Sequence, residues 1–140
     1  MVMHVDRPFQ LLIADDSQAF REVLREVFRH RPQLEVHEAE SGEEAVEVVR
    51  RQRIDIVLLD MHMRVMTGLD TLRVLKRLDV LRPCILITSD TSEELRRDAR
   101  DADAFSVLKK PLMKQQLVTT VSKALMTAYE SPGDLPPETP

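Results

Sequence analysis

The chain has few of the residues that mark disulfide-rich, membrane-spanning or collagen-like proteins. Its 140 residues include one cysteine, three glycines and no tryptophan. A single cysteine, Cys84, forms neither an internal disulfide nor a multi-cysteine zinc site, and three glycines exclude a collagen-like repeat. No apolar stretch approaches the roughly 18 residues of a membrane span, and the N-terminus lacks the apolar segment of a signal peptide. We therefore expect a cytoplasmic protein without a membrane span.

A basic excess is also missing. The 20 basic and 24 acidic residues give a formal net charge of −4, so the whole chain has no electrostatic attraction to nucleic acid. Arg21, Arg25 and Arg29 are spaced four residues apart and share one face of an expected helix. Because Glu22 and Glu26 interleave with this stripe and no aromatic residue accompanies it, we interpret it as a solvated face rather than a nucleic-acid patch.

The chain does have a fivefold alternation of short apolar runs and amphipathic stretches. Hydrophobic residues make up 43% of the sequence, enough for one continuous core. The apolar runs predict strands at 11–14, 34–39, 54–59, 84–87 and 105–108. The stretches between and after them predict five helices, because their apolar residues recur at helical spacing. The fourth helix has few apolar positions and is expected to pack most loosely.

Residues that cap helix N-termini stand before four of the expected helices. They are Ser17, Ser41 with Glu44 at capping-box spacing, Thr67 and Thr91. The first helix is expected to end at Arg31-Pro32. Residues 130–140 are acidic and contain prolines, which predicts a disordered tail or the beginning of a linker.

Strands that alternate with helices predict a parallel sheet covered on both faces, because right-handed crossovers place helices on either side. Ligands of such sheets bind beyond the carboxyl ends of the strands. Polar residues follow the apolar runs at that edge: Asp15, Asp16, Asp60, Thr88, Ser89, Lys109 and Lys110. A single acid there is explained by loop polarity or helix capping, but the whole set is not.

The chemistry of this set is that of phosphoryl handling. Three carboxylates close together repel one another unless a cation is present. Oxygen ligands suit Mg²⁺, which is usually held by one or two carboxylates together with phosphate oxygens. A lysine and a hydroxyl at the same edge would face a negatively charged group near Asp60.

These residues resemble the receiver domain of two-component response regulators. The motifs LLIADDS, IVLLDMHMRVMTG, ILITSD and VLKKPL occur in the order and spacing usual for that family. The resemblance covers about residues 9–129 and implies a CheY-like, flavodoxin-like α/β fold: a doubly wound five-stranded parallel sheet of order 2-1-3-4-5 with five helices. Residues 1–8 would be an N-terminal extension.

The resemblance also implies a role for each residue of the set. Asp60 would be the phosphoacceptor, which attacks a phosphohistidine and needs no base because a carboxylate is ionised at neutral pH. Asp15, Asp16, Asp60 and the backbone carbonyl of His62 would hold Mg²⁺. Lys110 would pair with a phosphoryl oxygen, with Lys109 as the fallback. The hydroxyl of Thr88 would reach the phosphate and couple it to the fourth helix.

Several positions depart from the family pattern or tune it. Arg64 stands where proline is usual, and Asp101 replaces a common glycine before Ala102. In the family, one position near the fifth strand usually holds an aromatic residue that acts in the switch. The local Ala-Phe pattern assigns this position to Phe105, whereas counting back from Lys110 assigns it to Val107, which is not aromatic. His62 and Asp90 hold positions that tune hydrolysis of the acyl phosphate, and Ser89 lies between Thr88 and Asp90.

The leading hypothesis is a stand-alone response regulator receiver that switches the binding of a downstream effector. It would take phosphate from a histidine kinase or phosphotransfer protein and catalyse only its own phosphorylation and dephosphorylation. The first alternative is a degenerate receiver that binds partners without phosphorylation. The second is an aspartyl-phosphate phosphatase, disfavoured because such enzymes carry an acid where His62 stands.

The chain has no additional module that would bind nucleic acid, so output is expected through a partner, or through a domain beyond Pro140 if the chain is a fragment of a longer regulator. Charges on the fourth helix are read either as a solvated surface or as an interface for a phosphorylation-dependent homodimer. They are Arg96, Arg97, Asp98, Arg100 and Asp101.

Overall fold

The computed structural model describes residues 7–129, so the expected tail at 130–140 lies outside the described residues. Five parallel strands form one sheet of order β2-β1-β3-β4-β5, which confirms the predicted topology. The strands are β1 (Phe9–Ala14), β2 (Leu34–Ala39), β3 (Ile56–Asp60), β4 (Cys84–Thr88) and β5 (Ser106–Lys109). The helices are α1 (Gln18–Val27), α2 (Gly42–Arg51), α3 (Gly68–Leu78), α4 (Glu93–Asp101) and α5 (Lys114–Tyr129).

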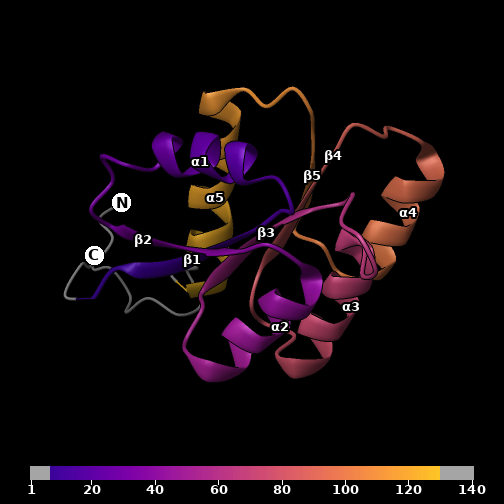
Figure 1. Cartoon of the computed structure of the whole chain (residues 1–140), viewed down its shortest axis with the longest axis horizontal. Coiled ribbons are helices and arrows are strands. Elements are labelled where there is room, and N and C mark those ends of the chain that lie inside the picture. The colour runs from indigo at the N-terminus through magenta and orange to yellow at the C-terminus, as the bar shows by residue number, and fades with distance from the viewer. Residues whose placement is uncertain (1–6, 130–140) are drawn as a thin grey trace, which may run out of the picture.

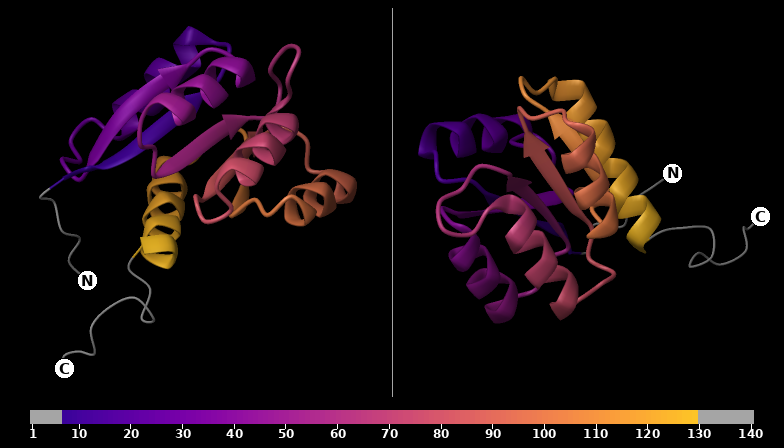
Figure 2. Two further views of the ribbon diagram at one scale, coloured as in Figure 1. Left: turned by 90° about the horizontal axis from the view of Figure 1, so that it is seen from below. Right: turned by 90° about the vertical axis from the view of Figure 1, so that its right-hand side faces the viewer.

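Helices cover both faces of the sheet, as Figures 1 and 2 show. Alternate side chains along each strand point to opposite faces. In β1, Leu11 and Ile13 pack with α1 and α5, whereas Leu12 packs with the buried residues of α2 and α3. β3 and β4 are buried along their whole length, as expected for central strands of a parallel sheet. This double core fixes the strand ends at which the polar residues lie.

Several helix and strand ends differ from the predicted ones: β1 begins at Phe9, β3 ends at Asp60, β4 ends at Thr88 and β5 spans Ser106–Lys109. α1 ends at Val27, one turn before Arg31-Pro32, because the chain turns back so that Leu34 can begin β2. The N-cap of α4 is Ser92, not Thr91: its Oγ accepts the N–H of Leu95. β3 begins at Ile56, two residues after the predicted start; before it, the Asp55 backbone N–H donates to the Gln10 carbonyl and the buried Asp55 carboxylate accepts the N–H of Gln10.

The capping box predicted at Ser41 is only half formed. Ser41 Oγ accepts the N–H of Glu44, but the Glu44 carboxylate accepts the N–H of Glu40 instead of that of Ser41. The reciprocal pair occurs at α3, where Thr67 and Asp70 each accept a backbone N–H of the other residue. Both arrangements satisfy N–H groups that the helix itself leaves unpaired.

The interpretation of the arginine stripe as a solvated face is wrong for one of its three members, Arg21, whereas Arg25 and Arg29 are exposed. Glu38 of β2 accepts Arg21 Nε at 2.8 Å and Arg25 Nε at 2.7 Å. The side chain of Arg21 is only 12% exposed. Arg29 does lie on the surface, paired with Glu26. Sequence spacing within α1 does not show that β2 returns beside this helix, so it does not predict the contact between Arg21 and Glu38.

Within residues 7–129, none of the helices has the length and apolar content needed to cross a membrane.

Candidate functional site

The carboxyl ends of β1 and β3 bring three aspartates together. Asp15 and Asp16 follow β1, and Asp60 is the last residue of β3. These two strands are neighbours, with Ala14 opposite Leu59. One carboxylate oxygen from each aspartate lies within 4.8 Å of the others. The structure therefore brings together the acidic set that was expected at this edge.

The buried Asp15 carboxylate is only half satisfied. Its Oδ1 accepts the N–H of Ser17 at 2.7 Å, whereas Oδ2 has no hydrogen-bond partner among residues 7–129. Burial raises the pKa of Asp15, and the negative charges of Asp60 and Asp16 raise it further. A buried, unpartnered carboxylate oxygen beside two more carboxylates fits a hard divalent cation such as Mg²⁺.

Asp60 is held from both sides. The backbone N–H of His62 donates to Oδ2 at 3.0 Å, and Lys110 Nζ forms an ion pair with Oδ1 at 2.7 Å. The Asp60 side chain is 4% exposed. The start of α3 packs directly against its backbone, since a Cβ placed on Gly68 would lie 2.5 Å from the Asp60 carbonyl oxygen.

Lys110 and Thr88 complete the edge. Lys110 follows β5, and its backbone N–H donates to the Thr88 carbonyl at 2.8 Å. Lys109 lies in β5 opposite Thr88, is exposed and makes no ion pair with Asp60 in the described part of the chain. Of the two lysines, Lys110 is the one that reaches the acidic cluster.

The Thr88 hydroxyl is fully buried and points back to its own loop. Its Oγ1 accepts the N–H of Asp90 at 2.9 Å, and the Asp90 carboxylate accepts the N–H of Ser92, the cap of α4. Thr88 is thus connected to α4 through two successive hydrogen bonds. Ser89, Asp90 and the side chain of His62 are exposed around this edge.

The two candidates for the switch aromatic occupy different places. Val107 lies in β5 opposite Leu86 and is partly buried, whereas Phe105 precedes the strand and is 37% exposed. The candidate that lies within β5 is therefore a valine, and the aromatic candidate lies outside the strand.

Asp101, expected to replace a glycine that is common in the family, does not adopt a left-handed backbone conformation. Asp101 is the last residue of α4, and the left-handed residue is Asp103, with φ 66°. The residue after a helix C-cap often adopts this conformation, which aspartate tolerates better than most side chains.

Sequence reasoning missed three features around the site. The ring of Phe20 lies under the Lys110 ammonium, 4.5 Å from Nζ to the ring centroid. Arg21 donates to the backbone carbonyl of Asp15. Val65, on the loop after Asp60, is 89% exposed at φ 69°, a conformation that a β-branched residue rarely adopts. One sequence signal bore on the position of the Phe20 ring: the Ser17 cap predicts where α1 begins and so places Phe20 in the first turn of that helix.

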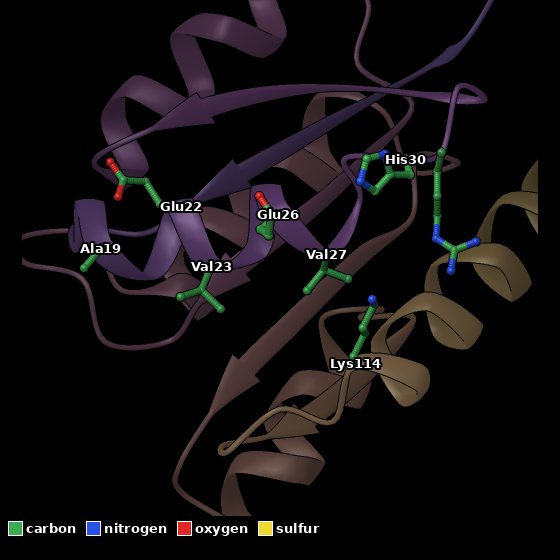
Figure 3. Close-up of a pocket in the computed structure, with 8 residues that line it drawn as sticks. Ala19, Glu22, Val23, Glu26, Val27, His30 and Lys114 are labelled. Atoms are coloured by element: carbon green, nitrogen blue, oxygen red, sulfur yellow. The ribbon is translucent and has the colours of Figure 1, made fainter.

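A groove runs along α1 toward the start of α5 (Figure 3). It has a volume of about 640 Å³ and is lined by Ala19, Glu22, Val23, Glu26, Val27, His30, Arg31 and Lys114. Val23 is 58% exposed there. Asp15, Asp16, Asp60, Thr88 and Lys110 are not among its lining residues.

A parallel sheet of this order, with an acidic cluster, a lysine and a hydroxyl at its carboxyl edge, defines the class of signal receivers. The family model described as "Response regulator receiver domain" matches residues 11–122, and the chain belongs to this family.

Among similar proteins is chemotaxis protein CheY of Halobacterium salinarum, 32% identical over 83% of this chain and 96% of that protein. A protein-glutamate methylesterase/protein-glutamine glutaminase of Pyrococcus horikoshii is 45% identical over 62% of this chain. The match covers only 24% of that protein, so this chain spans about a quarter of its length.

Solved structures agree with the fold. Chemotaxis protein CheY4 of Vibrio cholerae superposes with a TM-score of 0.79 at 26% identity, over 84% of this chain and 99% of the other. The signal receiver domain of an HD domain-containing protein of Pseudomonas fluorescens gives 0.84 at 21% identity, covering 89% and 100% of the two chains. At that identity the second likeness concerns the fold alone.

Proposed function

We propose that the chain is a phosphoacceptor receiver whose Asp60 takes a phosphoryl group from a phosphohistidine. The observation that supports this most strongly is the position of Asp60, beside two carboxylates and in an ion pair with Lys110. Family membership supports the same role. We propose residues 9–129 as the extent of the receiver unit.

The proposed reaction is an in-line substitution at phosphorus. A carboxylate oxygen of Asp60 forms the new O–P bond while the P–N bond of the donor breaks. The electron pair of that bond stays on the departing imidazole nitrogen, which takes a proton from solvent. The His62 N–H orients the carboxylate, and Lys110 offsets charge on the phosphoryl oxygens.

Asp15, Asp16, Asp60 and the backbone carbonyl of His62 would hold Mg²⁺. The unpartnered Oδ2 of Asp15 supports this assignment. A bound divalent cation supplies positive charge that stabilises the transferring phosphoryl group.

The proposed switch uses the hydrogen bonds that run from Thr88 to α4. If the Thr88 hydroxyl turns to a phosphoryl oxygen, the N–H of Asp90 loses its acceptor, and the loop that holds the Ser92 cap must rearrange. With Val107 in β5, this coupling does not rely on an aromatic side chain at that position. His62, Ser89 and Asp90 would tune hydrolysis from the rim.

The proposed partners are a histidine kinase or phosphotransfer protein and a downstream effector, in the cytoplasm. The groove of Figure 3 lies along α1, and its Val23 and Val27 offer apolar contact for the donor. We propose a stand-alone receiver without direct nucleic-acid binding and without enzyme activity on other substrates. A degenerate receiver and an aspartyl-phosphate phosphatase are the alternatives, and the charged α4 surface is the place where a phosphorylation-dependent homodimer would form.

A small acyl-phosphate donor tests the proposal. The protein is incubated with the donor and Mg²⁺, and the intact mass is measured. We expect one phosphoryl adduct on the wild type and on the control Asp70→Asn, and none on Asp60→Asn or without Mg²⁺. No adduct on the wild type favours the degenerate receiver, and rapid hydrolysis of unrelated phosphoesters favours the phosphatase.

A further inference from the structure

The Lys110 ammonium lies between a carboxylate and an aromatic ring. Its Nζ is 2.7 Å from Asp60 Oδ1 and 4.5 Å from the centroid of the Phe20 ring. A ring face carries partial negative charge and attracts a cation at this distance. The ammonium therefore has two attractive neighbours, only one of which accepts hydrogen bonds.

The position of the ring is set by the segment that also positions the acidic cluster. Asp15 Oδ1 accepts the N–H of Ser17, and Ser17 Oγ accepts the N–H of Phe20 at 3.2 Å. The Phe20 ring is partly buried against the core between the sheet and the α1–α5 layer. The hydrogen bonds of the first turn of α1 thus hold the Phe20 backbone, and contact with the core holds its ring beside the ammonium.

We propose that Phe20 is a positioning residue for Lys110, holding the ammonium at Asp60 and guiding it to the phosphoryl oxygens. This inference rests on the proposed function of Asp60. A lysine side chain has four flexible methylene groups, and that of Lys110 is 30% exposed, so an ion pair alone restrains it weakly. The ring adds attraction without occupying any of the three N–H donors, which stay available to carboxylate and phosphoryl oxygens.

Two substitutions separate this role from simple packing. Phe20→Leu keeps an apolar side chain but removes the ring, and Phe20→Tyr restores a ring. Phe28→Leu is the matched control: Phe28 directly follows α1, is 2% exposed in the same core, and lies far along the helix from Lys110. Its replacement is expected to lower stability without changing the reaction.

The first readout is the rate of phosphorylation by a small acyl phosphate with Mg²⁺. We expect Phe20→Leu to be slower by about three- to ten-fold, and Phe20→Tyr and Phe28→Leu to stay within about two-fold of the wild type. In a Lys110→Gln background, Phe20→Leu should cause no further loss. Equal slowing by Phe20→Leu and Phe28→Leu, or a further loss in that background, would overturn the proposal.

The second readout needs no phosphorylation. The ring current of Phe20 should shift the Lys110 Hε proton resonances upfield, and Phe20→Leu should abolish that shift while Phe20→Tyr keeps it. If the wild type shows the upfield shift but is never phosphorylated, the proposed function of Asp60 is refuted, whereas the contact between Phe20 and Lys110 is confirmed. Absence of the shift in the wild-type protein would refute the positioning role, whatever the variants do.

Discussion

Replacing Glu38 by glutamine should lower the free energy of unfolding by about 2 kcal/mol. Glu38 of β2 binds both Arg21 and Arg25 of α1. The Arg21 side chain is 12% exposed, so its charged hydrogen bond is weakly screened and is expected to contribute about 1.5–3 kcal/mol. The Arg25 side chain is 50% exposed, and its pair should add less than about 1 kcal/mol. For a unit of this size the loss corresponds to about 8 °C in Tm.

The same substitution gives a pH signature. The hydrogen bond from Arg21 is the main cause that lowers the pKa of Glu38 below its ordinary value of 4.5. A lowered carboxyl pKa stabilises the folded state above the unfolded pKa, and that stabilisation disappears as the pH falls through the folded pKa. The difference between wild type and Glu38→Gln should therefore be complete at neutral pH and shrink below about pH 4.5.

Urea unfolding followed by circular dichroism, at neutral pH and at about pH 3.5, measures both effects. The control is Glu26→Gln, because the ion pair of Glu26 with Arg29 has both side chains more than half exposed and should contribute close to nothing. Equal losses in the two variants would refute the reasoning. So would a loss for Glu38→Gln that persists unchanged at acid pH.

Three further predictions concern the site and the core. Asp15→Asn should raise the stability of the metal-free protein, since burial raises the pKa of Asp15, and should lower Mg²⁺ affinity. Urea titrations with and without Mg²⁺ check both, and a less stable metal-free variant would contradict the first. Gly68→Ala should cost about 2 kcal/mol and slow phosphorylation, because its methyl group would overlap the Asp60 carbonyl; wild-type stability and rate would exclude that contact. Burial raises the pKa of Cys84 to about 11. A disulfide reagent at neutral pH should therefore label the thiol of the native protein about 100-fold more slowly than that of the unfolded protein. Equal labelling rates would show that the native thiol is accessible.

Residues on adjacent strand ends were predictable, because strand order and pairing decide their proximity. Once β1 and β3 are neighbours, Asp15 and Asp60 must lie side by side. Alternation along the chain at the end of β5 likewise allowed only one of Lys109 and Lys110 to face the cluster, and that lysine is Lys110.

Contacts between separate layers were not predictable from spacing. The pairing of Glu38 with α1 depends on how β2 returns beside that helix. The Phe20 ring meets Lys110 only because the lysine side chain reaches across the sheet edge to Asp60 at the end of β3, the strand beside β1. The left-handed backbone conformation of Val65 was unpredictable for a different reason. Valine disfavours the left-handed region, so its residue type argues against the conformation that it adopts.

The central claim is that Asp60 itself carries the phosphoryl group. Treating the phosphorylated protein with borohydride reduces an aspartyl phosphate to homoserine, and peptide sequencing by mass spectrometry then locates the converted residue. We expect homoserine at position 60 and at no other aspartate. Conversion at Asp15, Asp16 or another aspartate while position 60 stays intact would contradict it.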